Sequence, residues 1–292
     1  MIEKEDIMDK QAFIEKLNSL NLPAGEYYIL SSGCLLLYGL REKVGDIDLC
    51  VSQELFENVL KNKYHLDENN RNEYGFYKLC DDVEIVVNDK NDSKYKFEYD
   101  IVDGYPVQKL GIILKDKKKR NLPKDQKDIE NIIKFLYENF EICNTKEHQE
   151  YIEEIATLTQ QEWGKCGLTD EEFETKVKNK IDNIKRKLNE KDYCKLLLVF
   201  RQELVGFVSI FPNDCDERPD LTPWYATMFV KEEYRKIGCS KILNDAILQE
   251  AKKRGIKRLY LKTNLDNYYE RFGAKYIETL SSGEKLYNYT VS

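Results

Sequence analysis

The sequence lacks any apolar run long enough to cross a membrane, and it contains only two histidines, His65 and His148. Its eight cysteines are scattered, and none of them forms a C-x-x-C pair. This pattern argues against a zinc site and favours reduced thiols in a cytoplasmic protein. Residues 1–6 are charged and have no apolar core, so we expect no signal peptide there.

Charged residues make up 34% of the chain, and the mean hydropathy is −0.63. The formal net charge of −7 comes from an excess of acidic residues in positions 1–145, whereas the remainder is balanced. An acidic half argues against nucleic acid as the main partner and suits small cationic substrates. The length of 292 residues allows two domains, which we place at 1–143 and 147–292. Residues 141–147 have no strong pattern, and we expect the linker there.

Residues 224–254 predict a strand, a short basic turn and a helix. The stretch 224–230 is rich in β-branched and aromatic residues, and apolar residues recur at helical spacing from Ile242 onward. Backbone N–H groups point out of the first turn of a helix, which favours anion binding at residues 235–240. Gly238 would let the backbone approach a phosphate closely because it has no Cβ atom.

This turn resembles the acyl-CoA-binding motif of the GNAT family of N-acetyltransferases, whose pattern is Arg or Gln, two residues, Gly, one residue, and Gly or Ala. Ser240 occupies the last position, a small departure that still allows close approach. Residues 221–226 and 268–273 resemble the same family in the same order. The resemblance covers about 147–292 and implies a mostly antiparallel, splayed central sheet that binds acetyl-CoA.

The resemblance also implies functional residues. Tyr269 would protonate the leaving thiolate, and the acidic loop 213–220 would face a small amine substrate, with Glu217 and Asp220 as candidate bases. A solvated loop is the alternative for 213–220. Acetyl-CoA would contact a set of residues in the strand and the turn and one beyond them: Met228, Phe229, Val230, Arg235, Lys236, Ile237, Gly238, Cys239, Ser240 and Asn264.

The N-terminal half predicts a strand at 27–30, a turn into a short apolar helix at 31–41, and a second strand at 45–51. Asp46 and Asp48 would project to the same face of the second strand. Two adjacent carboxylates repel one another, and a bound hard cation relieves that repulsion. The alternative is a solvated strand edge.

This order of elements resembles the polymerase-β-type nucleotidyltransferases, including small antibiotic nucleotidyltransferases. The resemblance continues in 123–128, which is close to the K-D-x-x-D segment of some of these proteins. It implies Mg²⁺ and ATP, with a set of metal and nucleotide contacts: Asp46, Asp48 and Glu84 at the metal, and Ser32, Gly33 and Lys124 at the nucleotide.

Ser31 stands where that family usually has its first glycine. The leading interpretation is therefore an α/β (α+β) protein in which an acetyl-CoA-dependent N-acetyltransferase is fused to a nucleotidyltransferase-like domain, suited to bacterial-type modification of a small molecule. Two alternatives stay open. The protein could be bifunctional, or primarily transfer nucleotides to a small hydroxylated molecule such as an antibiotic. The N-terminal half could also be a non-catalytic nucleotide-sensing module.

Overall fold

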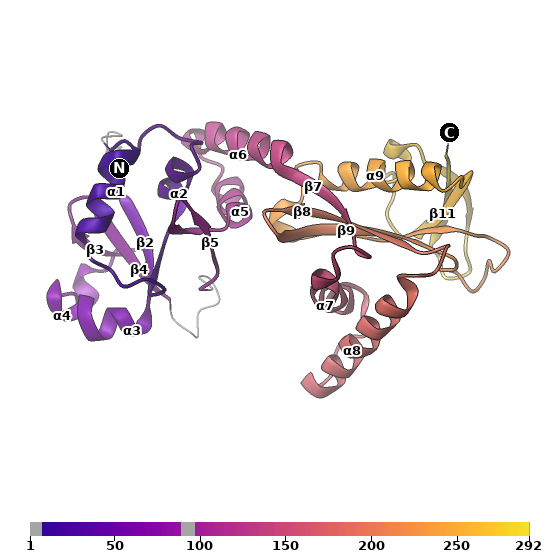
Figure 1. Cartoon of the computed structure of the whole chain (residues 1–292), viewed down its shortest axis with the longest axis horizontal. Helices are drawn as coiled ribbons and strands as arrows, with labels where there is room; N and C mark the ends of the chain where they lie inside the picture. Colours follow the sequence, from indigo (N-terminus) through magenta and orange to yellow (C-terminus); the bar gives the residue numbers. More distant parts are fainter. Residues whose placement is uncertain (1–7, 89–96, 292) are drawn as a thin grey trace. The chain divides into compact units, whose positions relative to one another are not determined.

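The computed structural model describes residues 8–88 and 97–291, and residues 1–6 lie outside this part of the chain. The chain divides into two compact units, Met1–Phe135 and Leu136–Ser292 (Figure 1). Each unit contains one mixed β-sheet with helices, which confirms the predicted α/β class. In the described residues no helix is long and apolar enough to cross a membrane.

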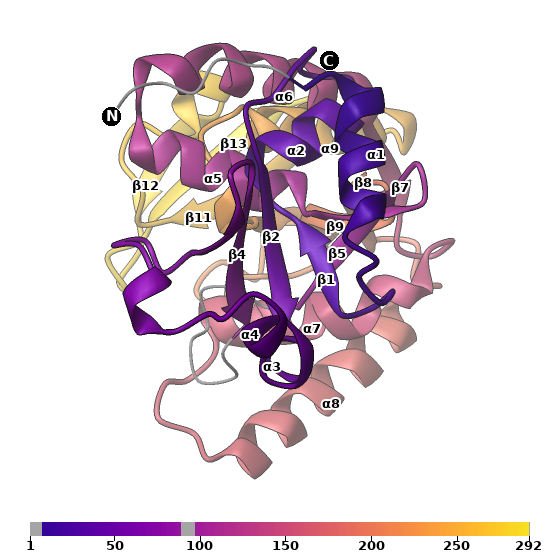
Figure 2. The same ribbon diagram turned by 90° about the vertical axis from the view of Figure 1, so that its left-hand side faces the viewer.

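The N-terminal unit is built on a six-stranded sheet in the order β3-β4-β2-β1-β6-β5 (Figure 2). Strand β2 pairs parallel with β4 and antiparallel with β1, and β1 pairs parallel with β6. The strands are β1 (Tyr27–Ile29), β2 (Ile47–Ser52), β3 (Tyr77–Cys80), β4 (Val83–Asn88), β5 (Tyr99–Val102) and β6 (Tyr105–Gln108). The helices are α1 (Lys10–Ser19), α2 (Ser31–Leu37), α3 (Gln53–Leu55), η1 (Phe56–Leu60), α4 (Lys61–Lys63), η2 (Glu68–Asn70), α5 (Leu110–Arg120) and η3 (Pro123–Asp125).

One residue, Leu30, separates β1 from α2, where the sequence predicts a turn into a short helix at 31–41. Its first residue, Ser31, has φ +47°, in the left-handed region that favours glycine. Gly33 is buried, and a Cβ atom there would lie 2.7 Å from the Phe13 ring and 2.8 Å from Ile29. Gly33 therefore has a packing role, because it lets α1 approach α2 and β1.

A buried cluster of charges links α5 to the start of α6 (Gln126–Asn139). The Lys117 ammonium lies 3.1 Å from Asp125 and 2.8 Å from Asp128, and all three side chains are less than 10% exposed. Arg120 donates two hydrogen bonds to Asp125, and Arg41 lies 3.9 Å from Asp128. The two aspartates of the 123–128 segment thus stabilise the N-terminal unit, whereas Lys124 is exposed.

The C-terminal unit is built on a seven-stranded sheet in the order β12-β13-β11-β10-β9-β8-β7. All neighbours are antiparallel except β10 and β11, in agreement with the predicted mostly antiparallel sheet. The strands are β7 (Phe140–Asn144), β8 (Cys194–Phe200), β9 (Glu203–Phe211), β10 (Trp224–Val230), β11 (Arg258–Thr263), β12 (Lys275–Thr279) and β13 (Lys285–Thr290). The helices are η4 (Gln149–Tyr151), α7 (Ile152–Trp163), α8 (Asp170–Lys187), η5 (Glu232–Tyr234), α9 (Cys239–Lys253) and η6 (Glu270–Phe272).

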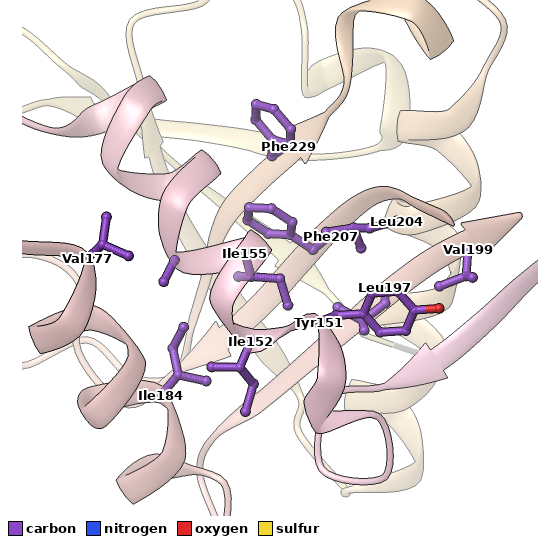
Figure 3. Close-up of a cluster of buried hydrophobic side chains, with 11 residues drawn as sticks. Tyr151, Ile152, Ile155, Val177, Ile184, Leu197, Val199, Leu204, Phe207 and Phe229 are labelled. Carbon is purple, nitrogen blue, oxygen red and sulfur yellow. The ribbon is translucent and has the colours of Figure 1, made fainter. Parts of the chain in front are cut away.

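Helices cover both faces of this sheet, with α9 on one face and α7 and α8 on the other (Figures 1 and 2). Figure 3 shows the core under α7 and α8, where Ile155, Val177 and Ile184 belong to the same buried cluster as Phe207 of β9. Helix α8 begins with a capping box, in which Thr169 and Glu172 exchange hydrogen bonds. These contacts fix α8 along the sheet, so the polar residues beside Ile184 occupy defined positions.

Residues 141–147 differ from the sequence-based expectation of a linker. Phe140–Asn144 forms the edge strand β7, which pairs with β8 from Phe140↔Phe200 to Asn144↔Leu196. An edge strand gains much of its stability from backbone hydrogen bonds, which leave little trace in the hydrophobic pattern. The domain bounds 1–143 and 147–292 remain a prediction.

Replacing Lys117 with Met should destabilise the N-terminal unit by about 3 kcal/mol, because two buried carboxylates lose their shared cation. Hydrogen exchange followed by mass spectrometry would show faster exchange in peptides from α5 and α6. The matched control is Lys119→Met, an exposed position on the same helix. Equal exchange rates in the two variants would contradict a structural role for the cluster.

Candidate functional site

Strand β10 is interrupted at its centre. Its pairing with β9 shifts register between Ala226 and Phe229, because three steps along β10 match two steps along β9. Thr227, inside the bulge, has φ +50°, which is strained for a β-branched residue. Backbone strain of this kind persists where the surrounding structure enforces it, and it is concentrated at functional sites.

Strands β10 and β11 also separate from one another. Their parallel pairing has a single register position, Trp224↔Tyr260, which agrees with the splay that the sequence predicts. A cavity of about 700 Å³ opens beside the bulge. It is lined by residues 225–228 of β10, by residues 261–265 in and after β11, and by side chains from α7, α8, β8 and β9. The cavity is large enough for a small molecule.

A buried lysine lies on the wall of this cavity. Lys195 of β8 is paired in register with Ser209 of β9, and its ammonium donates to the Ser209 hydroxyl at 2.6 Å. It also lies 3.3 Å from the Thr227 hydroxyl, which is 2.6 Å from that of Ser209. Burial lowers the pKa of Lys195 to about 7. This network of three side chains connects β8 to the bulge of β10.

The acidic loop 213–220 contributes one carboxylate to the cavity, that of Asp214. Burial raises the pKa of Asp214 to about 6, against the opposing effect of Lys262. The two predicted bases have other partners. Glu217 accepts a hydrogen bond from the Ser281 amide at 2.8 Å, and Asp220 forms an ion pair with Arg218. Neither is among the residues that line the cavity.

Tyr269 does line the cavity, as its predicted role requires. Its ring packs edge-on against Tyr225, with 5.7 Å between the ring centroids, and burial raises its pKa above the ordinary value. The hydroxyl of Tyr225 is buried and has no hydrogen-bond partner in the described residues. A buried polar atom without a partner is costly, so a polar ligand in the cavity would stabilise this arrangement.

The turn at 235–240 has the shape of an anion-binding helix start. Gly238 has φ +92° and precedes α9, whose first turn leaves backbone N–H groups without intrahelical acceptors. The hydroxyl of Tyr137 donates to the Ile237 carbonyl at 2.6 Å, and a Cβ atom on Gly238 would overlap that hydroxyl. The side chain of Arg235 donates to the Val230 carbonyl at 2.8 Å, and Lys236 is exposed.

The structure thus places Met228, Asn264 and Tyr269 at one cavity, and the turn 235–240 at the start of α9. Sequence reasoning missed Lys195 as a functional residue, although a single lysine in the otherwise apolar run 194–200 is an available signal. It also could not single out Asp214 among the carboxylates of its loop.

Comparison with known proteins agrees with this geometry. Residues 149–274 match the model of the acetyltransferase (GNAT) family. The GNAT resemblance that the sequence shows is confirmed over these residues, which are less than half of the chain. The match supports an acyltransferase with acetyl-CoA as its cofactor. No curated protein sequence matches the chain.

Three solved structures illustrate what the chain is similar to. An aminoglycoside 6'-acetyltransferase type Ii is 19% identical, with a TM-score of 0.41, and the match covers 52% of this chain and 97% of that protein. An aminoglycoside 6'-N-acetyltransferase complexed with coenzyme A is 16% identical, with a TM-score of 0.41 and coverage of 52% and 97%. The PaiA N-acetyltransferase from Thermoplasma acidophilum, in complex with coenzyme A, is 19% identical, with a TM-score of 0.38 and coverage of 52% and 99%.

The three carboxylates of the predicted metal site, Asp46, Asp48 and Glu84, lie in the N-terminal unit. Asp48 of β2 is paired in register with Glu84 of β4, and Asp46 directly precedes β2. Within residues 8–88 and 97–291, no group of three or more His, Cys, Asp or Glu side chains could hold a metal ion. Asp46, Asp48 and Glu84 do not form such a group in the described residues, and a metal site there stays a prediction.

Replacing Gly238 with Ala should weaken acetyl-CoA binding at least tenfold, or about 1.4 kcal/mol, because the added Cβ overlaps the Tyr137 hydroxyl and displaces the turn. Isothermal titration measures the change. Gly255→Ala is the matched control, since Gly255 also has a positive φ but meets no atom within 4 Å. Adding Tyr137→Phe to Gly238→Ala should recover part of the affinity, and equal losses in both glycine variants would contradict the account.

Proposed function

We propose that the C-terminal unit is an acetyl-CoA-dependent N-acetyltransferase that acts on a small amine. The observation that supports this most strongly is the opening of β10 at its bulge onto a cavity that holds both a carboxylate, Asp214, and a tyrosine, Tyr269. These are the two proton-transfer groups that amide formation from a thioester requires. The strained backbone at Thr227 supplies polar groups beside them.

Acetyl-CoA supplies the acetyl group as a thioester. Two residues of the chain then transfer protons. Asp214 takes the proton from the acceptor ammonium, directly or through one water, so that the nitrogen lone pair can attack the carbonyl carbon. The new C–N bond forms as the C–S bond breaks. Tyr269, which burial keeps protonated, gives its proton to the departing thiolate sulfur. The second proton that the nitrogen loses as the amide forms returns to Tyr269 through solvent.

The residues of the turn and the bulge would hold the cofactor. Backbone N–H groups at the start of α9 suit the pyrophosphate, since a helix N-terminus attracts anions. Met228, Phe229 and Val230 would face the pantetheine amides, and Asn264 lies at the same cavity. The unpaired Tyr225 hydroxyl and the cavity volume both agree with a polar, elongated ligand.

For the N-terminal unit we propose a nucleotidyltransferase-like fold. Two observations favour it: Asp48 lies beside Glu84 across the parallel β2–β4 pair, and Ser31 holds the left-handed conformation of a glycine at the start of α2. Such a domain would bind Mg²⁺ and ATP, either to modify a small hydroxylated molecule or to sense the nucleotide. Titration of Mg²⁺-ATP into the wild-type chain and into Asp48→Asn tests it, and equal binding to both would contradict it.

Asp214→Asn should lower kcat/KM about 10²–10⁴-fold, because the base is removed. Below about pH 6 the wild-type carboxyl is protonated, so kcat/KM should fall as the pH drops through 6, and the variant should lack this dependence. Lys262, Lys187 and Glu284 act electrostatically on Asp214. Release of the CoA thiol measures the rate, with Glu217→Gln and Asp220→Asn as controls. An unchanged pH profile in Asp214→Asn would exclude Asp214 as the base.

Tyr269→Phe should lower kcat about 100-fold while acetyl-CoA binding persists, because the hydroxyl acts on the leaving group during the reaction. Steady-state kinetics and titration of acetyl-CoA separate the two effects. The neighbouring Tyr268→Phe is the matched control. A loss of binding without a loss of kcat would assign Tyr269 a purely structural role.

A further inference from the structure

One wall of the cavity carries two lysines, Lys187 and Lys195, that form no ion pair in the described residues. Lys195 is 3% exposed, and its hydrogen-bond partners in the described residues are the hydroxyls of Ser209 and Thr227. Hydroxyls stabilise an ammonium group less well than a carboxylate does, so a buried lysine in this setting is under-compensated. Burial lowers the pKa of Lys195 to about 7, and the positive charge of Lys187 acts in the same direction.

A second lysine lies on the same wall. The ammonium groups of Lys187 and Lys195 lie 5.2 Å and 5.8 Å from the centre of the Phe211 ring, and both residues line the cavity. Tyr193 stacks on Phe211, with 5.6 Å between the ring centroids and 10° between the ring planes. The Tyr193 hydroxyl is buried and has no hydrogen-bond partner in the part of the chain that the structure describes. Two ammonium groups and one tyrosine therefore gather around a single aromatic ring.

The position of Lys187 follows from the packing of α8. Ile184, three residues earlier, is buried in the core shown in Figure 3. Lys180 lies four residues before Ile184, and helical geometry places all three residues on one face. Lys180, Ile184 and Lys187 all line the cavity. The charged wall is therefore a fixed part of the fold.

Two of the carboxylates that line the cavity lie close to basic side chains other than Lys187 and Lys195. Glu284 is 3.0 Å from Lys262, and Glu162 is 3.6 Å from Arg235. Asp214 interacts electrostatically with Lys262 and Lys187 but forms no ion pair in the described residues. An acceptor with many positive charges would be repelled by the α8 and β8 wall, whereas an anionic group would find two ammonium groups there.

We propose that the acceptor carries an anionic group, a carboxylate or a phosphate, that binds between Lys187 and Lys195 while its amine faces Asp214. This proposal rests on the proposed N-acetyltransferase function and specifies its substrate class as a small amine with one anionic group. It differs from the small cationic substrate that the acidic N-terminal half suggests. A phosphate and a carboxylate share the required chemistry, and the experiment distinguishes them.

The test uses the full chain and five amine probes: glycine, glycinamide, O-phosphoethanolamine, ethanolamine and spermidine. Each anionic probe has a neutral counterpart of similar shape. Thiol release from acetyl-CoA should give at least a tenfold higher kcat/KM for glycine over glycinamide, or for O-phosphoethanolamine over ethanolamine. The pair that shows the preference identifies the group. A preference for spermidine or for the neutral probes would overturn the proposal.

Variants locate the subsite. Lys187→Met and Lys195→Met should each reduce the preference for the anionic probe about tenfold, mainly through KM, and Lys187→Arg should retain it because the charge remains. Lys185→Met, an exposed position on the same helix, is the matched control and should keep the preference. Lys187 lies at a half-buried helix end, so Lys187→Met tests the site even if Lys195→Met does not fold. Equal preference in Lys187→Met and wild type would overturn the proposal.

Direct titration of the anionic probes, without acetyl-CoA, separates this inference from the proposed function. Binding that Lys187→Met weakens supports the subsite even if no acetyl group is transferred. If acetyl-CoA binds and amines are acetylated but the anionic probes bind no more tightly than their neutral counterparts, the function stands and the subsite is wrong.

Discussion

The broken pairing of β10 determines how the C-terminal unit can work. Hydrogen bonds to β9 hold both ends of β10, but the register slips between Ala226 and Phe229, and the contact with β11 is limited to one register position. An unbroken sheet would satisfy these backbone groups internally and leave no space between the strands. The strain at Thr227 is offset by the hydroxyl network that ties it to Ser209 and Lys195. The same break thus creates the cavity and holds its polar groups in place.

The cavity beside this break is lined by an acidic side chain, Asp214, and by basic side chains, among them Lys195. Asp214 lies in the loop that follows β9, and burial disfavours its negative charge. Lys195 lies on β8, and burial disfavours its positive charge. A bound molecule with an amine and an anionic group would relieve both costs at once. The apolar core that fixes α8 therefore contributes to specificity, because it determines where Lys187 lies.

Much of this architecture follows from local sequence patterns. The strand at 224–230 and the helix that begins near Gly238 are predicted because β-branched and apolar residues follow the periods of a strand and a helix. Strand β7 is missed because an edge strand has a weak hydrophobic pattern. The choice of Asp214 over Glu217 and Asp220 depends on how loop 213–220 folds over the sheet, which residue type alone does not encode. Lys195 could be found only by asking why an apolar strand contains a charge.

The central claim is that the bulge of β10 and the turn at 235–240 form an acetyl-CoA site. Isothermal titration of acetyl-CoA into the wild-type chain tests it most directly. The account predicts binding of one acetyl-CoA per chain with a dissociation constant in the micromolar range, about −8 kcal/mol. No detectable heat at millimolar acetyl-CoA would contradict it, because the turn would then be an ordinary helix start and the cavity would serve another ligand.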